Sequence, residues 1–394
     1  MERTPTTEST YLVVLRGQST ARFPQDRQIV VENFPTADRR VDVLFRTRYA
    51  DEGFEALVPR EFMAEVRVPA TSIVEAVEVG ANAANMLKSA IAFTANAWVD
   101  DLDVHLAYDM TPGHREREFF ETFLPEERGI LRPGRRIDGA TTIAFINALK
   151  SHIEGERLRR AMVQYGLALS QFRPGREILA LAHLFMGMEA LTQVALRREL
   201  SAKGMSEEAL AKSYGIDVAN DVCGRWKGQL AAMIRQRILF EGDEECHQRA
   251  KKASDGFEHG FLAFPDIWSR ALGSYERTAG YLRSAIIRLA DVPDDARRRL
   301  LNPPYNRPFE VTPISRHQRG HLVGDAEDLA QEGQPHPIIR WESSIKFLKR
   351  APSGEYQIEV KDQFTEMLGE GVEFRPISQE VWGPQQDPPI GKEA

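Results

Sequence analysis

Residues 179–196 read LALAHLFMGMEALTQVAL, and they decide the fold because they are apolar on nearly every side of a helix. A helix that is apolar all round is buried, so this one should lie at the centre of a helical bundle. Glu189 is an exception on it, and an unpaired buried carboxylate would be costly. Glu189 should therefore have a partner, either in a buried structural ion pair or in a site where it orients a histidine or a basic side chain.

Helical periodicity continues on both sides of this central segment. It extends over residues 141–170, 176–200, 224–240, 243–253 and 261–289. We therefore predict an all-helical bundle over residues 138–291. The Pro-, Gly- and Arg-rich residues 125–136 indicate the boundary that precedes it.

The residues before the bundle contain short runs rich in β-branched and aromatic side chains, separated by turn-forming residues. The runs are 11–15, 28–32, 41–49 and 63–68, which is typical of a small antiparallel sheet. Thr71 and Ser72 offer a helix cap, residues 73–98 follow as one long helical pattern, and residues 101–109 alternate like a half-buried strand. Residues 1–135 are therefore predicted to form a sheet covered by a long helix.

The C-terminal residues, 292–394, begin rich in Pro, Arg and Gly and then contain strand-like runs. These runs are 338–341, 356–361 and 372–374, and they indicate a Pro-rich wrapping tail with short strands and a hairpin. The fold class that follows is α+β. It has an N-terminal sheet-plus-helix unit, a central helical bundle and an extended C-terminal tail.

Composition excludes several classes of protein. A net charge of −7 over 394 residues gives no overall attraction to polyanions, which disfavours a tight, sequence-independent DNA binder. Two cysteines are too few for a disulfide scaffold and fit a reducing compartment. Residues 1–10 lack the pattern of a secretory signal, and no uncharged apolar run approaches the roughly 20 residues of a membrane-spanning helix. We expect a cytoplasmic protein with no membrane partner.

The common catalytic motifs are absent from the sequence. It has no Gly-x-x-x-x-Gly-Lys-Ser/Thr loop, no strand-linked Gly-x-Gly-x-x-Gly, no His-Glu-x-x-His and no Gly-x-Ser-x-Gly. Cofactors are therefore not expected. Asp101, Asp103 and His105 alternate, so on a strand they would share one face and present ligands that suit a hard or borderline cation. A solvated strand face explains the same pattern, and we expect no metal site.

Residues 253–260 read ASDGFEHG and are predicted to join two helices of the bundle. A histidine beside cations suits acid–base chemistry on the phosphodiester of RNA. His259 would accept the proton of the 2′-hydroxyl or donate one to the leaving oxygen, and a nearby cation would stabilise the charge on the phosphate. In the alternative interpretation, His259 hydrogen-bonds a helix end at this glycine-flanked turn.

Residues 165–289 resemble the HEPN domains of prokaryotic defence proteins. The resemblance is carried by the hydrophobic helix with LFMGMEAL at residues 184–191 and by the later polar-x-x-x-His-Gly sequence. HEPN domains are all-helical bundles and are commonly dimeric. Many are ribonucleases with an arginine, a polar residue and, after a short spacer, a histidine.

This resemblance assigns roles to individual residues. His259 matches the family histidine, and Asp255 stands where the polar residue is expected. The family arginine falls at or near Ser254, so the motif is degenerate, and Lys252 is the nearest substitute. Lysine presents a point charge to a phosphate, whereas arginine presents a bidentate fork.

Two hypotheses follow. The first is a HEPN-like defence or stress protein that acts as a metal-independent endoribonuclease, with His259, Asp255, Lys252 and Glu189 as site residues. Its partners would be RNA and a second copy of the chain, and DNA is not expected. The second is a non-catalytic binding or assembly protein whose helical bundle mediates dimerisation.

Overall fold

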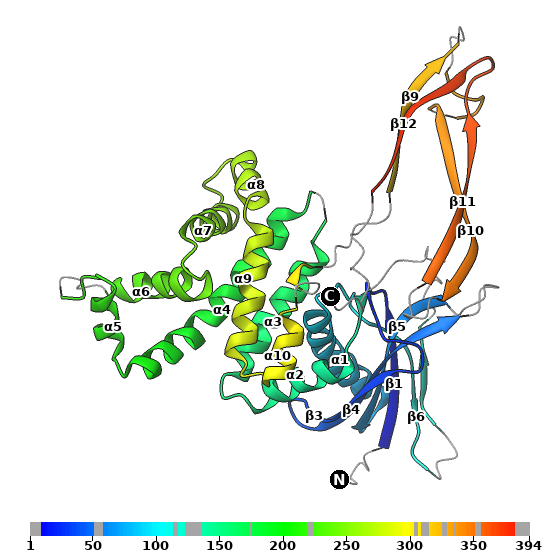
Figure 1. The fold of residues 1–394 in the computed structure, drawn as a ribbon. Coiled ribbons are helices and arrows are strands. Elements are labelled where there is room, and N and C mark those ends of the chain that lie inside the picture. Colours follow the sequence, from blue (N-terminus) through cyan, green and yellow to red (C-terminus); the bar gives the residue numbers. More distant parts are fainter. Residues whose placement is uncertain are drawn as a thin grey trace, which may run out of the picture. The chain divides into compact units, whose positions relative to one another are not determined.

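The computed structural model describes residues 9–50, 58–112, 117–122, 135–173, 175–219, 224–302, 306–308, 315–324, 329–334, 336–350 and 356–382 (Figure 1). The chain forms two compact units. Unit 1 contains Met1–Arg48 and Arg60–Val311, and unit 2 contains Tyr49–Pro59 and Thr312–Ala394. The fold is mixed α+β, as predicted.

Unit 1 contains a six-stranded sheet in the order β3-β4-β5-β1-β6-β7. Its strands are β1 (Ser9–Gly17), β3 (Gln28–Pro35), β4 (Arg40–Ala50), β5 (Val58–Ala70), β6 (Asp103–Asp109) and β7 (Phe119–Glu121). Strand β1 pairs antiparallel with both β5 and β6. Val41, Val43 and Phe45 on β4 are all buried, as the two-residue repeat of a strand requires. The strands predicted from the alternating pattern are confirmed.

Helix α1 (Ile73–Ala95) packs across β1 and β6, as the sequence predicts. Ser72 caps its first turn by accepting a hydrogen bond from the Glu75 amide. The helix ends earlier than predicted because Asn96 adopts a left-handed conformation with φ 48°. Gly80 allows the close approach to the sheet, since a Cβ there would lie 3.1 Å from the Val13 side chain.

The remaining helices of unit 1 form a bundle around α4 (Figure 1). They are α2 (Gly139–Ser151), α3 (Gly155–Ser170), α4 (Glu177–Lys203), α5 (Glu207–Ser213), α6 (Trp226–Ile234), α7 (Glu244–His259), α8 (Phe264–Leu272), α9 (Tyr275–Leu289) and α10 (Asp294–Leu300). Between α6 and α7 lies a π-helical turn, η1 (Arg235–Leu239). Helix α4 contacts α3, α6, α7, α8, α9 and η1, so the prediction that it is the central helix is confirmed.

Helix α4 is long enough and apolar enough to cross a membrane, yet 67% of its most apolar 18-residue stretch is buried inside the structure. Burial of that kind is typical of the core helix of a soluble protein. Gly187 sits where α9 crosses it, because a Cβ at this position would lie 2.6 Å from a methyl group of Leu282.

Several predicted helix limits differ from the structure. Residues 141–170 form two helices, α2 and α3, and residues 261–289 form α8 and α9. Helix α7 continues through residues 253–259, so that segment is not a junction, and the chain turns only at Gly260. Residues 294–300 are helical, whereas an extended tail is predicted from residue 292.

The sheet and the bundle share one hydrophobic core. Phe93 of α1 stacks on Phe145 of α2 at 4.8 Å and meets the edge of Tyr165 of α3 at 5.4 Å. The Tyr165 hydroxyl donates to Asn96 Oδ1 at 2.6 Å. Unit 1 therefore joins the predicted range 1–135, apart from Tyr49–Pro59, and the predicted range 138–291 in one body. Of the predicted connection at 125–136, only residues 135 and 136 are described.

Unit 2 contains two antiparallel ribbons. Strand β10 (Ile338–Arg350) pairs with β11 (Tyr356–Met367), and β9 (Ser315–Val323) pairs with β12 (Glu373–Trp382). The predicted strands and hairpin in the C-terminal region are therefore confirmed, although the strands are longer than the sequence indicates.

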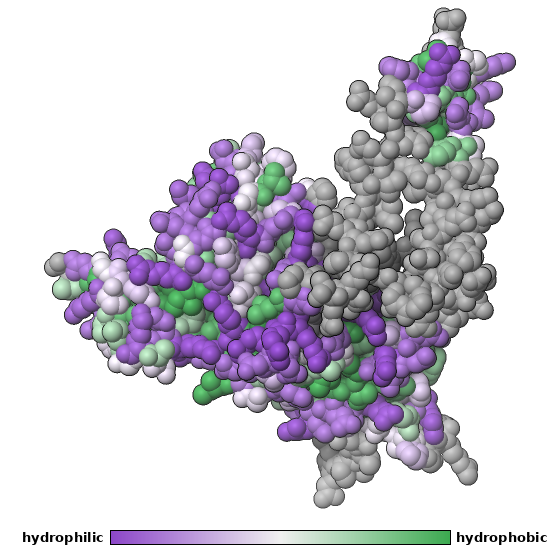
Figure 2. Space-filling view, viewed as in Figure 1, coloured by the Kyte–Doolittle hydropathy of each residue, from purple (hydrophilic) through white to green (hydrophobic). Residues whose placement is uncertain are grey.

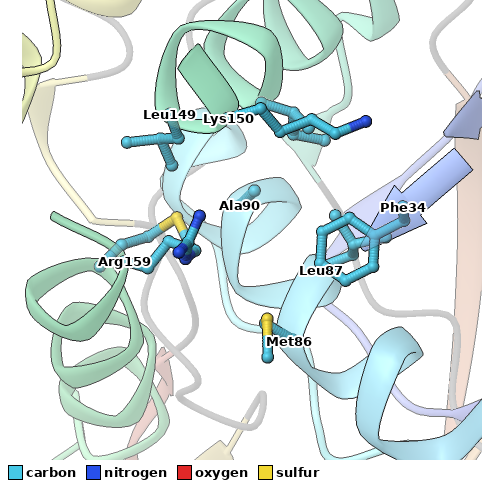
Figure 3. A pocket seen from close by; sticks show the side chains of 9 residues that line it. Phe34, Met86, Leu87, Ala90, Leu149, Lys150 and Arg159 are labelled. Carbon is cyan, nitrogen blue, oxygen red and sulfur yellow. The ribbon is translucent and has the colours of Figure 1, made fainter. Parts of the chain in front are cut away.

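A small apolar hollow lies between β3, α1, α2 and α3 (Figure 3). Two cations stand at its edge, but their charged ends are engaged elsewhere. Lys150 Nζ donates to the Glu32 carbonyl at 3.3 Å, and Arg159 donates to the Glu156 carboxylate at 2.9 Å. We assign this hollow no function.

Candidate functional site

Helix α7 carries three of the four predicted site residues, and both of its ends are fixed. Asp243 caps its start by accepting from the Cys246 amide at 3.1 Å. Gly260 ends it in a left-handed conformation with φ 67°. Gly256 allows the segment after the helix to pack against α7, because a Cβ at this position would lie 2.7 Å from Leu262. The two glycines therefore end the helix and let the chain fold back against it.

Lys252, Asp255 and His259 lie on one face of α7, since they are three and four residues apart. Lys252 and His259 are exposed, and Asp255 is half-buried and pairs with Lys251. His259 is the last residue of the helix, and its ring lies 6.5 Å from that of Phe261. The side chain of His259 makes no hydrogen bond within the part of the chain that the structure describes. The alternative in which it bonds a helix end is therefore not seen.

Ser254, where the arginine of the motif would stand, points into the protein. It is buried, and its hydroxyl donates to Glu258 Oε1 at 2.9 Å. Helix α7 thus offers no guanidinium at that position.

An arginine approaches the predicted residues from a different element. Arg235 opens the π-helical turn η1, and its side chain is only 15% exposed. Its Nη1 lies 3.4 Å from Thr192 Oγ1 and 4.0 Å from Glu189 Oε1. Burial lowers the pKa of Arg235, and the negative charges of Glu189 and Asp255 oppose that shift. Arg235 is therefore a cation beside Glu189 of α4, and its charge also interacts with Asp255 of α7.

Glu189 has a partner, as expected, but the pair is not buried. Its side chain is 51% exposed, and Arg235 lies beside it on the inner side. The buried structural pair predicted for Glu189 is therefore wrong, and the interpretation in which it lies beside a basic side chain matches its position. The carboxylate avoids the cost of burial because α4 leaves this part of its surface open to water.

His247 on α7 is a polar residue that the sequence did not single out. Its side chain is 1% exposed, and neither ring nitrogen has a hydrogen-bond partner. The ring meets the Phe240 ring edge-on at 5.2 Å. Burial, followed by the charges of Arg235 and Lys251, lowers the pKa of His247 to about 4. The four-residue spacing of His247, Lys251 and Asp255 is the signal that could have found it.

These residues form two linked groups. We name the exposed face of Lys252, Asp255 and His259 the α7 face, and we name Arg235 with the two neighbours of its guanidinium, Thr192 and Glu189, the η1 seam. The charge of Arg235 also acts on Asp255 and His247. The α7 face can exchange protons with a ligand in solvent through its histidine. The η1 seam supplies a guanidinium whose Nε has no hydrogen-bond partner in the described structure.

The structure does not bring Asp101, Asp103 and His105 together as a set of ligands. Among the described residues, no group of three or more His, Cys, Asp or Glu side chains is placed to hold an ion. Asp101 pairs instead with Lys88, and His105 Nδ1 lies 3.4 Å from the Thr122 carbonyl.

The chain was compared with protein-family models, with curated proteins and with solved structures, and none of these matches it.

Proposed function

We propose that this chain is a HEPN-like defence or stress protein that cleaves RNA without a metal ion, with the α7 face as its active site. The observation that carries the proposal is that Lys252, Asp255 and His259 share one face of α7, with the charge of Arg235 acting on Asp255. The resemblance to HEPN domains supports it, since those enzymes combine an arginine, a polar residue and a histidine.

In the reaction, the 2′-hydroxyl attacks the adjacent phosphorus and the 5′-oxygen leaves. The products are a 2′,3′-cyclic phosphate and a 5′-hydroxyl. His259 transfers the proton of the attacking or the leaving oxygen, and Lys252 offsets the negative charge on the phosphate. Asp255 and Glu189 hold Arg235 in place. DNA lacks the 2′-hydroxyl, so it is not a substrate.

The test is an RNA-cleavage assay in EDTA with wild type and His259→Gln at equal folded concentration. The matched control is His336→Gln, which changes an exposed histidine of unit 2. We expect cleavage by wild type and by the control, loss of cleavage in His259→Gln, and no cleavage of the same sequence as DNA. If wild type leaves a range of tRNA and mRNA substrates intact, the proposal is overturned.

A second function has its own supporting observation. Helices α7 and α8 and the turn between them expose large apolar side chains: Phe257, Phe261, Phe264, Trp268 and Leu272. In Figure 2 a hydrophobic spot stands out among hydrophilic side chains beside α8. Exposed apolar side chains of this size favour an interface, so a non-catalytic assembly protein that dimerises through its bundle is the alternative.

Sedimentation equilibrium tests this alternative. If the bundle dimerises through α8, Phe264→Ser should shift the mass toward that of a monomer. Ile153→Ser is the matched control, because Ile153 is 98% exposed and lies between α2 and α3. Dimers that persist in Phe264→Ser would show that this surface is not the dimer interface.

A further inference from the structure

His247 is buried without the contacts that a buried polar group normally has. Its ring fills the space between α7 and the Phe240 ring at the end of η1. Neither nitrogen finds a partner in the described structure, although one of them carries a proton in the neutral ring. Most buried polar side chains have at least one hydrogen bond, so this one departs from the usual pattern.

The charges that face His247 oppose its protonation. Arg235 comes from η1, and Lys251 is one turn further along α7. The nearby carboxylates are engaged with other cations: Glu189 with Arg235, Asp255 with Lys251 and Asp243 with Arg277.

Of the side chains that reach this region from α9, Arg277 is charged and pairs with Asp243, whereas Thr278 and Tyr281 are neutral. Next to His247, Cys246 contacts the Ser274 carbonyl and the Thr278 hydroxyl. Tyr281 of α9 donates to Asp243 at 2.8 Å and packs against Phe240. An imidazolium at position 247 would therefore be a buried charge beside two cations, with no carboxylate paired to it.

We propose that the contact between α7 and η1 is an acid-sensitive latch, closed while His247 is neutral and opened more often in weak acid, because that imidazole takes up a proton in the open state. Release separates the first turns of α7 from Phe240 and Arg235. The latch follows from burial, missing partners and neighbouring charge, so it does not depend on RNA cleavage. If the proposed function is correct, release also removes Arg235 from the α7 face and lowers the activity.

The direction of the pH dependence follows from the two states. In the open state His247 titrates near 6.5, and in the closed state burial and the two cations hold its pKa at about 4. Protons therefore bind the open state preferentially. The latch keeps its full strength above pH 6.5 and weakens as the pH falls from 6.5 toward 4.

Amide hydrogen exchange tests the latch on the full chain. Protection factors, corrected for the intrinsic pH dependence of exchange, are measured for η1 and the first half of α7 at pH 7 and pH 5. These factors report the local opening equilibrium. We expect a fall of about 20-fold in wild type and in His336→Gln, and no comparable fall in His247→Phe, which keeps an aromatic ring against Phe240.

A second measurement keeps the test decisive if His247→Phe folds poorly. The imidazole proton resonances of the native protein are followed by NMR between pH 7 and pH 5, and His247→Gln assigns the signal of residue 247. We expect the His247 resonance not to titrate over this range in the folded protein. A midpoint near 6.5, or equal loss of protection in wild type and the His247 variants, would overturn the latch. Intact RNA with an acid-sensitive α7 would overturn only the proposed ribonuclease activity.

Discussion

The guanidinium of Arg283 lies 4.8 Å from the centre of the Phe93 ring and donates to the Phe93 carbonyl at the end of α1. It also reaches the Leu300 carbonyl at 3.2 Å and the Thr94 carbonyl at 3.5 Å. Its side chain is 2% exposed, and burial lowers the pKa of Arg283 to about 10. At neutral pH the residue stays charged, where it complements the negative end of the α1 dipole.

Arg283→Met should therefore destabilise unit 1. The change leaves carbonyl oxygens of α1 and α10 without their donor, and we expect a loss of about 2–4 kcal/mol in the free energy of unfolding. Urea denaturation followed by circular dichroism measures it. Arg160→Met, at an exposed position of α3, is the control and should change stability by less than about 0.5 kcal/mol. Equal stability of the two variants would mean that Arg283 does not hold α1 and α9 together.

The crossing of α4 and α9 offers a matched pair of glycine substitutions. Gly187→Ala should cost about 1–3 kcal/mol, because the added methyl group would lie 2.6 Å from Leu282. Gly280→Ala should stabilise the protein by about 0.5–1 kcal/mol, because Gly280 is in the interior of α9 and nothing lies within 4 Å of the added atom. The denaturation midpoints of both variants are compared with that of wild type. Stabilisation by Gly187→Ala would contradict the close packing of α4 against α9.

Asp243 should make the start of α7 sensitive to strong acid. Burial alone would raise the pKa of Asp243, but hydrogen bonds from the Cys246 amide, Tyr281 and Arg277 bring it below the ordinary 3.8. The stabilisation that the Asp243 carboxylate gives to α7 is complete above pH 3.8 and is lost as the pH falls below that value.

The variant Asp243→Ala should lose about 1–2 kcal/mol at pH 7, through the missing cap and the unpaired Tyr281 hydroxyl. The difference from wild type should shrink when unfolding is measured below pH 3.8. Asp103→Ala, at an exposed strand position, serves as control. A difference that stays constant down to low pH would show that the carboxylate charge of Asp243 is not what stabilises α7.

Arg235 gives the sharpest test within the proposed active site. If its guanidinium supports the α7 face, Arg235→Gln should lower RNA cleavage by about 100-fold at equal folded concentration, because a misplacement of catalytic groups by about 1 Å can cost that much. Arg235→Lys should restore part of that loss. Arg160→Gln is the control for a general change of charge. Full activity in Arg235→Gln, with none in His259→Gln, would remove Arg235 from the mechanism.

The sequence predicts most of the fold because local patterns carry it. Alternation in β4 and the apolar surface of α4 each identify an element without knowledge of its neighbours. The breaks between helices do not follow from local pattern. Gly155 begins α3 where a Cβ would lie 2.5 Å from the Leu149 carbonyl of α2, and that constraint exists only after the two helices have packed.

The candidate site is only partly predictable. The spacing of Lys252, Asp255 and His259 places them on a common face of a helix, but the predicted helix ends at residue 253, whereas α7 continues to His259. The approach of Arg235 depends on a π-helical turn, for which the sequence carries no signal that we can identify. The exposure of Glu189 depends on which parts of α4 its neighbours leave uncovered.

The core shared by α1, α2 and α3 also has a consequence for synthesis of the chain. Phe93 and Asn96 leave the ribosome well before Phe145 and Tyr165, the side chains that cover them. Until those helices have been made, the apolar end of α1 stays open to water and to other nascent chains. The end of α1 therefore reaches its native packing only with the bundle, and a fragment that stops at residue 135 should expose this apolar surface and tend to aggregate.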